Sequence, residues 1–158
     1  MSKIIFLDID GVICTMGGFI HPDYNHPSKC WHSFHKPAIE QLNRITDKTG
    51  AQIVISSTWR NSHALKELQA FFKQAGTTGD IIDRTPNPET APGDYEPLRG
   101  LEVNLWLAAN KQVDTYVIID DDNDFTDEQK KILLVKTTAI DGLTAKAADQ
   151  AIQILGEF

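Results

Sequence analysis

The chain has 158 residues with 41% hydrophobic content, which suits one domain around a single core, so we expect one domain over residues 1–158. Acidic residues exceed basic ones by 22 to 15, and the formal charge of -7 excludes the overall basic surface of dedicated nucleic-acid binders. Apolar runs are far too short to span a membrane, and two cysteines outside any CxxC pair, without a signal-like N-terminus, favour a soluble cytoplasmic protein.

Short apolar runs rich in β-branched residues alternate along the chain with amphipathic patterns of helical period. This alternation predicts an α/β fold: a three-layer, Rossmann-like parallel sheet with helices on both faces, in which ligands bind at the carboxyl ends of the strands. The predicted elements are, in chain order, strand 4–7, helix 37–49, strand 52–55, helix 62–75, strand 80–83, helix 101–110, strand 116–119, helix 126–134, strand 133–137 and helix 144–155.

Two irregular segments interrupt this alternation, 14–36 and the proline-rich 84–98. Loops this long in a compact domain are more often functional than idle, so we expect 14–36 to form a flap beside a site. Its aromatic side chains could stack on a substrate ring or anchor the loop to the core. Tight ligand pairs are missing, which disfavours a zinc site. The histidines and cysteine concerned are His21, His26, His32, His35 and Cys30.

Polar residues follow three of the predicted strands directly. In a parallel sheet these residues converge on one edge, where buried carboxylates require a stabilising cation, and Mg²⁺ prefers such oxygen ligands. The alternative is a solvated acidic rim. A calcium-binding loop is excluded because the expected glycine and glutamate are missing after each candidate first aspartate. The residues concerned are Asp8 and Asp10, Ser56 and Ser57, and Asp120, Asp121 and Asp122.

Four stretches resemble, in order and spacing, the motifs of the haloacid dehalogenase (HAD) superfamily of phosphotransferases. They are DIDGV, ISS, an arginine ahead of a helix at position 99, and IIDDDND. More narrowly, LDIDGV, TGAQIVISSTWR, RGLEVNLWL and YVIIDDDND resemble the small HAD domains associated with RNA-repair proteins. The resemblance spans nearly the whole chain. No segment is long enough for the large cap domain of many relatives, so we expect an open site.

The resemblance implies a role for each residue of the first motif. Asp8 would attack phosphorus and form an aspartyl-phosphate. Asp10 would protonate the leaving oxygen and then deprotonate the attacking water. Gly11 would let the chain turn sharply beside the substrate.

The other motifs would supply the metal site and the groups that bind phosphate. Mg²⁺ would be held by Asp8, the backbone carbonyl of Asp10 and an aspartate of the 120–122 run, for which the sequence leaves Asp120, Asp121 and Asp122 open.

Ser56 would donate a hydrogen bond to a phosphoryl oxygen, with Ser57 as the alternative. Arg99 would supply fixed positive charge where the superfamily usually has lysine, and Arg60 could share this role or be an ordinary surface charge. Trp59 and Trp106 are expected to serve in packing.

These roles predict a magnesium-dependent phosphomonoester hydrolase, with polynucleotide ends or nucleotides as candidate substrates. One alternative is a small-metabolite phosphatase closed by the two loops. Another is a phosphoryl-accepting receiver module, which would need an aspartate where this chain has Ser56. A non-catalytic module that binds phosphate or a partner protein is the third. The sequence identifies no partner protein.

Overall fold

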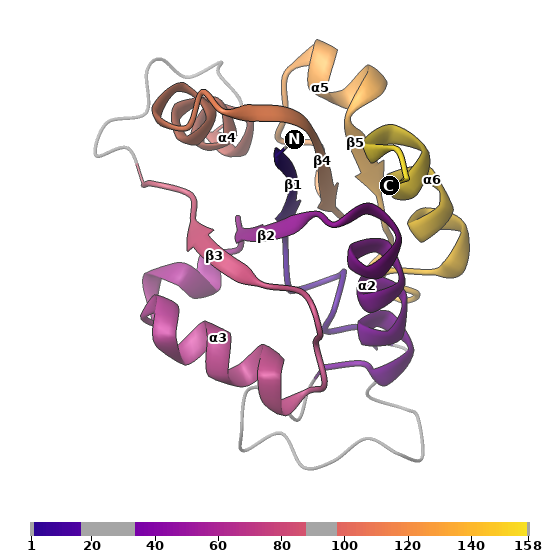
Figure 1. The fold of residues 1–158 in the computed structure, drawn as a ribbon. Helices are drawn as coiled ribbons and strands as arrows, with labels where there is room; N and C mark the ends of the chain where they lie inside the picture. The colour runs from indigo at the N-terminus through magenta and orange to yellow at the C-terminus, as the bar shows by residue number, and fades with distance from the viewer. Residues whose placement is uncertain (1, 17–33, 88–97, 158) are drawn as a thin grey trace.

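The computed structural model describes residues 2–16, 34–87 and 98–157, which form a parallel sheet between two layers of helices (Figure 1). All four strand pairs are parallel, and the sheet order is β3-β2-β1-β4-β5. The predicted α/β class with a parallel sheet is therefore confirmed. The strands are β1 (Ser2–Leu7), β2 (Gln52–Ile55), β3 (Ile81–Arg84), β4 (Val113–Asp120) and β5 (Leu134–Lys136). The helices are α2 (Lys36–Thr49), the 3₁₀ helix η2 (Thr58–Asn61), α3 (Leu65–Gln74), α4 (Leu98–Ala109), α5 (Asp127–Ile132) and α6 (Ala145–Leu155).

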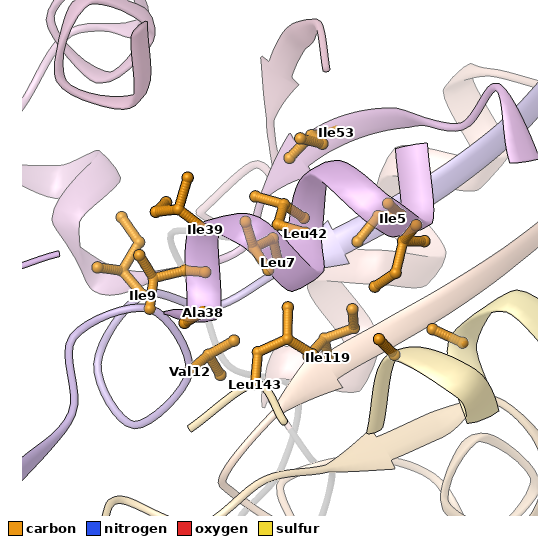
Figure 2. Close-up of a cluster of buried hydrophobic side chains, with 14 of the residues drawn as sticks. Ile5, Leu7, Ile9, Val12, Ala38, Ile39, Leu42, Ile53, Ile119 and Leu143 are labelled. Carbon is orange, nitrogen blue, oxygen red and sulfur yellow. The ribbon is translucent and has the colours of Figure 1, made fainter. Parts of the chain in front are cut away.

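The central strand β1 contributes alternate side chains to two separate cores. Ile5 and Leu7 face the larger core, which contains apolar residues of α2, α3 and α6. Figure 2 shows Ile39 and Leu42 of α2 beside Leu7 in this cluster. Phe6 faces the opposite way, into a smaller core that α4 covers. Burial of each such aliphatic or aromatic side chain stabilises the fold by about 1.5–3 kcal/mol, so both faces of β1 are fixed by packing.

The chain reverses its direction of travel across the sheet at β1. Strands β2 and β3 lie on one side of β1, and β4 and β5 lie on the other. A crevice forms at such a switch point, outside the carboxyl ends of the strands, and it is the usual ligand site of an open α/β sheet. The strand ends of β2, β1 and β4 are therefore the place to look for chemistry.

Local signals set several of the predicted helix ends. Helix α2 ends where Gly50 adopts a φ of 68°, which favours glycine. Thr126 and Thr144 accept hydrogen bonds from backbone amides of the first turns of α5 and α6, as predicted for N-caps.

Two helix starts differ from the prediction by three residues, and the other three differ by one. Helix α3 starts at Leu65 instead of residue 62, because 58–61 form η2 and the Glu67 carboxylate accepts from the amide of Ala64. Helix α4 starts at Leu98 instead of residue 101. The cause is a contact with Asp124, described with the candidate active site.

The two irregular segments lie mostly outside the described residues. Arg84 and Leu98, predicted as loop residues, instead end β3 and start α4. The predicted absence of a large cap domain and the predicted flap with His21, His26, Cys30 and His32 both depend on 17–33 and 88–97. These segments lie outside the described residues, so both stay predictions. No helix in the described part of the chain has the length and apolar character needed to cross a membrane.

Candidate active site

Three adjacent strands deliver one polar residue each to the switch point. Asp8 follows β1, and its amide donates to the Ile119 carbonyl of β4 over 3.0 Å. Ser56 follows β2, and its amide donates to the Leu7 carbonyl over 2.9 Å. Asp120 is the last residue of β4. Hydrogen bonding between the strands thus continues into the site and fixes the backbones of these residues. The residues converge at one edge of the sheet, as predicted for parallel strands.

A cluster of three carboxylates lies at this edge, formed by Asp8, Asp120 and Asp121. One oxygen from each lies within 4.8 Å of the other two. Asp8 and Asp120 are only 3% and 0% exposed. Burial, together with the nearby charge of Asp8, raises the pKa of Asp120 to about 8, although Arg99 opposes the shift. Burial likewise raises the pKa of Asp8, again against the effect of Arg99. The surroundings therefore do not fully compensate the negative charge that the cluster would carry with all three carboxylates ionised.

Arg99 is the cation that reaches this cluster. Its Nη1 lies 3.1 Å from Asp120 Oδ2 and 3.4 Å from Asp8 Oδ1, and it donates to the Ser56 carbonyl over 3.0 Å. Burial lowers the pKa of Arg99, but Asp8 and Asp120 outweigh this effect, so that its pKa is raised. The guanidinium thus stays charged beside the strand ends.

Asp124 caps the first turn of α4, and this turn contains Arg99. The sequence predicted that Arg99 lies ahead of the helix. The Asp124 carboxylate accepts from the amides of Leu98 and Arg99 over 3.1 and 3.3 Å. A carboxylate at these free amides stabilises a helix start, which explains the early start of α4. The capping residue is 26 positions away from Leu98 along the chain, so local sequence patterns could not reveal it.

Gly11 allows the loop after β1 to approach Asp121 of the cluster. It has a φ of 78°, and a Cβ at this position would collide with the carboxylate of Asp121. Its carbonyl accepts from the Thr137 hydroxyl over 2.6 Å. The glycine is thus required by both backbone conformation and space, and its predicted contact with substrate stays a prediction.

The two serines have different surroundings. Among the described residues, the buried Ser56 hydroxyl has no hydrogen-bond partner. The Ser57 hydroxyl accepts from the Trp59 amide over 3.2 Å and so caps η2. A buried hydroxyl without a partner is costly, and a ligand oxygen would satisfy it. This difference favours Ser56 over Ser57 as the ligand-binding hydroxyl.

Arg60 is buried and is paired with Glu102, a residue that the sequence analysis did not single out. The Arg60 Nη2 and Glu102 Oε1 atoms are 2.7 Å apart, and the side chains are 4% and 11% exposed. Arg60 Nη1 donates to the carbonyls of Ser56 and Ser57 over 3.0 and 2.8 Å. Burial lowers the pKa of Arg60 and raises that of Glu102, and each charge opposes the shift of the other. These contacts of Arg60 are internal, and its predicted role in substrate binding stays a prediction.

Asp10 differs from the three aspartates of the cluster because it is exposed. Its Oδ2 accepts from the Trp59 indole Nε1 over 3.0 Å. Asp10 is not among the three carboxylates that cluster, and its predicted metal contact uses the backbone carbonyl.

The donor set of the cluster fits Mg²⁺. Three carboxylates offer hard oxygen ligands, and two of them are buried within ion-pair distance of Arg99. A divalent cation would neutralise the remaining charge. The fit thus rests on Asp8, Asp120 and Asp121.

Comparison with known proteins gave one family. A model of the HAD domain in Swiss Army Knife RNA repair proteins matches residues 4–148. Neither the search of curated proteins nor the search of solved structures found a match. The match covers β1 from Ile4 onward, the other four strands in full and the whole carboxylate cluster. The chain therefore belongs to the family of HAD domains found in Swiss Army Knife RNA repair proteins.

Proposed function

We propose that the chain is a magnesium-dependent phosphatase that hydrolyses phosphomonoesters through an aspartyl-phosphate on Asp8. The observation that carries this proposal is the convergence of Asp8, Asp120 and Asp121 with Arg99 at the switch point of the sheet. Membership of the HAD family supports phosphatase-like chemistry. The fixed strand end at Asp8 suits a nucleophile, because in-line attack depends on exact placement of the attacking oxygen.

The proposed reaction has two steps. A carboxylate oxygen of Asp8 bonds to phosphorus, the ester P–O bond breaks, and the leaving oxygen takes a proton from Asp10. Asp10, now a carboxylate, removes a proton from water as the water oxygen bonds to phosphorus. The bond between phosphorus and Asp8 then breaks. The products are an alcohol and inorganic phosphate, and both aspartates return to their starting states.

The remaining groups stabilise the charge of the phosphoryl group. Arg99 offers a guanidinium beside Asp8, and the Ser56 hydroxyl is free to donate to a phosphoryl oxygen. Mg²⁺, held by Asp8, Asp120 and Asp121 with the Asp10 carbonyl, would neutralise the repulsion between phosphate and carboxylates.

The proposed substrates are phosphorylated polynucleotide ends, with free nucleotides as the smaller candidate. Support comes from the family, whose description places these domains in RNA repair proteins. With a net charge of -7, the chain would bind a polynucleotide end by local contacts at the site rather than by its overall field.

Phosphate release tests the proposal. The substrates are p-nitrophenyl phosphate, nucleoside monophosphates and oligonucleotides with a 5′- or 3′-phosphate, each with Mg²⁺ or with a chelator. We expect Mg²⁺-dependent release by the native protein and none above background by a folded Asp8→Asn variant. Equal release by both proteins would refute the mechanism, and the preferred substrate would decide between polynucleotide ends and small metabolites.

A further inference from the structure

The hydrogen bond between Trp59 and Asp10 links an aromatic side chain to the proposed acid and base of the reaction. The distance from indole Nε1 to Asp10 Oδ2 is 3.0 Å. Asp10 is exposed, so no core among the described residues fixes the rotamer of its carboxylate. An exposed aspartate samples several rotamers, and proton transfer needs one of them. The indole thus supplies an orientation that packing around Asp10 does not provide.

Trp59 is itself held in place from several directions. It lies in η2, where its amide donates to the Ser57 hydroxyl over 3.2 Å. Its ring packs against Phe34 and His63, with ring centroids 5.7 and 5.8 Å away. Phe34 in turn contacts Phe72 of α3 at 4.8 Å and belongs to the larger core. The indole N–H is therefore a donor attached to the folded core.

We propose that Trp59 is a positioning residue that orients Asp10 for proton transfer, an inference that rests on the proposed phosphatase function. An indole N–H can only donate, so it occupies Oδ2 in both protonation states of Asp10. The other oxygen, Oδ1, is left to carry the proton. Trp59 thereby fixes which oxygen of Asp10 serves the leaving group and, in the second step, the attacking water.

The proposal predicts a dependence on the leaving group. An alkyl phosphate releases a strongly basic alkoxide, which needs the proton from Asp10 as the P–O bond breaks. A p-nitrophenyl phosphate releases a stable phenolate, which needs little help. Loss of the correct Asp10 orientation should therefore slow alkyl phosphates more than p-nitrophenyl phosphate, whereas loss of folded protein would slow both equally.

The test uses Trp59→Phe, which keeps an aromatic ring and removes the N–H donor. We expect kcat/KM for an alkyl phosphate to fall about fivefold, the effect of one hydrogen bond, while kcat/KM for p-nitrophenyl phosphate stays within about twofold. Trp106→Phe is the matched control, because the Trp106 indole donates to a carboxylate outside the site, Asp83, over 2.7 Å. Trp106→Phe should leave kcat/KM unchanged for both the alkyl phosphate and p-nitrophenyl phosphate. Equal losses on both substrates, or no loss, would overturn the proposal.

A second measurement tests the contact without relying on activity. In a ¹⁵N–¹H spectrum, the indole resonance that disappears in Trp59→Phe identifies Trp59. Asp10→Ala should shift that resonance and leave the Trp106 resonance in place. An unmoved Trp59 resonance would refute the positioning contact even in an active enzyme. A shifted resonance in a protein without Asp8-dependent phosphate release would support the contact and refute the proposed function.

Discussion

Replacement of Glu102 by alanine should destabilise the protein markedly, although Glu102 is not a predicted ligand. The change leaves Arg60, which is 4% exposed, without its carboxylate partner at 2.7 Å. Breaking a buried ion pair by removing one partner costs about 3–5 kcal/mol, because a buried charge remains uncompensated. Arg60 keeps three acceptors, the carbonyls of Ser56 and Ser57 and the Asn87 side chain. We therefore expect the lower end, about 3 kcal/mol in the free energy of unfolding.

Thermal and urea unfolding followed by circular dichroism would measure this loss. For a chain of this size, about 3 kcal/mol corresponds to a fall in Tm of roughly 6–12 °C. Glu102→Gln should lose less, because the amide oxygen can still accept from Arg60. Asp149→Ala is the matched control, since it removes the carboxylate partner of Arg44 in an exposed pair that contributes about 0–1 kcal/mol. If Glu102→Ala costs no more than Asp149→Ala, the argument for a stabilising buried pair is wrong.

Three further predictions concern the site itself. Arg99→Gln should lower kcat for phosphate release by about 10²–10³-fold, because a preorganised group that stabilises transition-state charge is lost. The metal-free protein should lose stability as pH rises from about 4 to about 8, because the pKa of Asp120 is raised from 3.8 to about 8 and the folded state retains a proton that the unfolded state releases. The free energy of unfolding should decline less steeply across this pH range in the Asp120→Asn variant than in the native protein. Ser56→Ala should keep its Tm but lose about tenfold in kcat/KM, because its hydroxyl has no partner within the described residues. Ser57→Ala should instead lose about 1 kcal/mol of stability through the cap to the Trp59 amide and keep most of its activity.

Each of these predictions has its own contradicting result. Arg99→Lys keeps a positive charge, so activity as low as in the glutamine variant would point to geometry rather than charge. A pH slope that Asp120→Asn leaves unchanged would assign the titration to another group. A Ser57→Ala variant that loses activity and keeps its Tm would exchange the roles of the two serines.

The sheet and the convergence of its strand ends could be predicted because they depend on short-range patterns. Runs such as 4–7 and 52–55 are apolar and β-branched, so they read as central strands, and parallel pairing then places Asp8, Ser56 and Asp120 at one edge. Caps at Thr126 and Thr144 follow equally local rules. These features need no knowledge of contacts that are distant in sequence.

Contacts across long stretches of sequence account for the differences. Asp124 caps α4 from 26 positions away from Leu98, so the sequence placed Arg99 ahead of the helix and not within it. The burial of Arg60 depends on its ion pair with Glu102 of α4. Glu102 lies three residues after Arg99, and residues i and i+3 share a helix face, so this spacing could have indicated that Glu102 lies near the site. Trp59 was expected to pack, which it does, but its indole also donates to Asp10.

The central position of β1 affects how the protein responds to destabilising substitutions. The strand is paired on both edges and buried on both faces, and the Asp8 amide extends this pairing. Such amides exchange with solvent only when the whole domain opens, whereas the edge strands β3 and β5 can fray separately. Asp8, the proposed nucleophile, thus belongs to the last part of the fold to lose its order. Destabilising substitutions elsewhere would then reduce the number of active molecules in a cell and leave the turnover of each folded molecule intact.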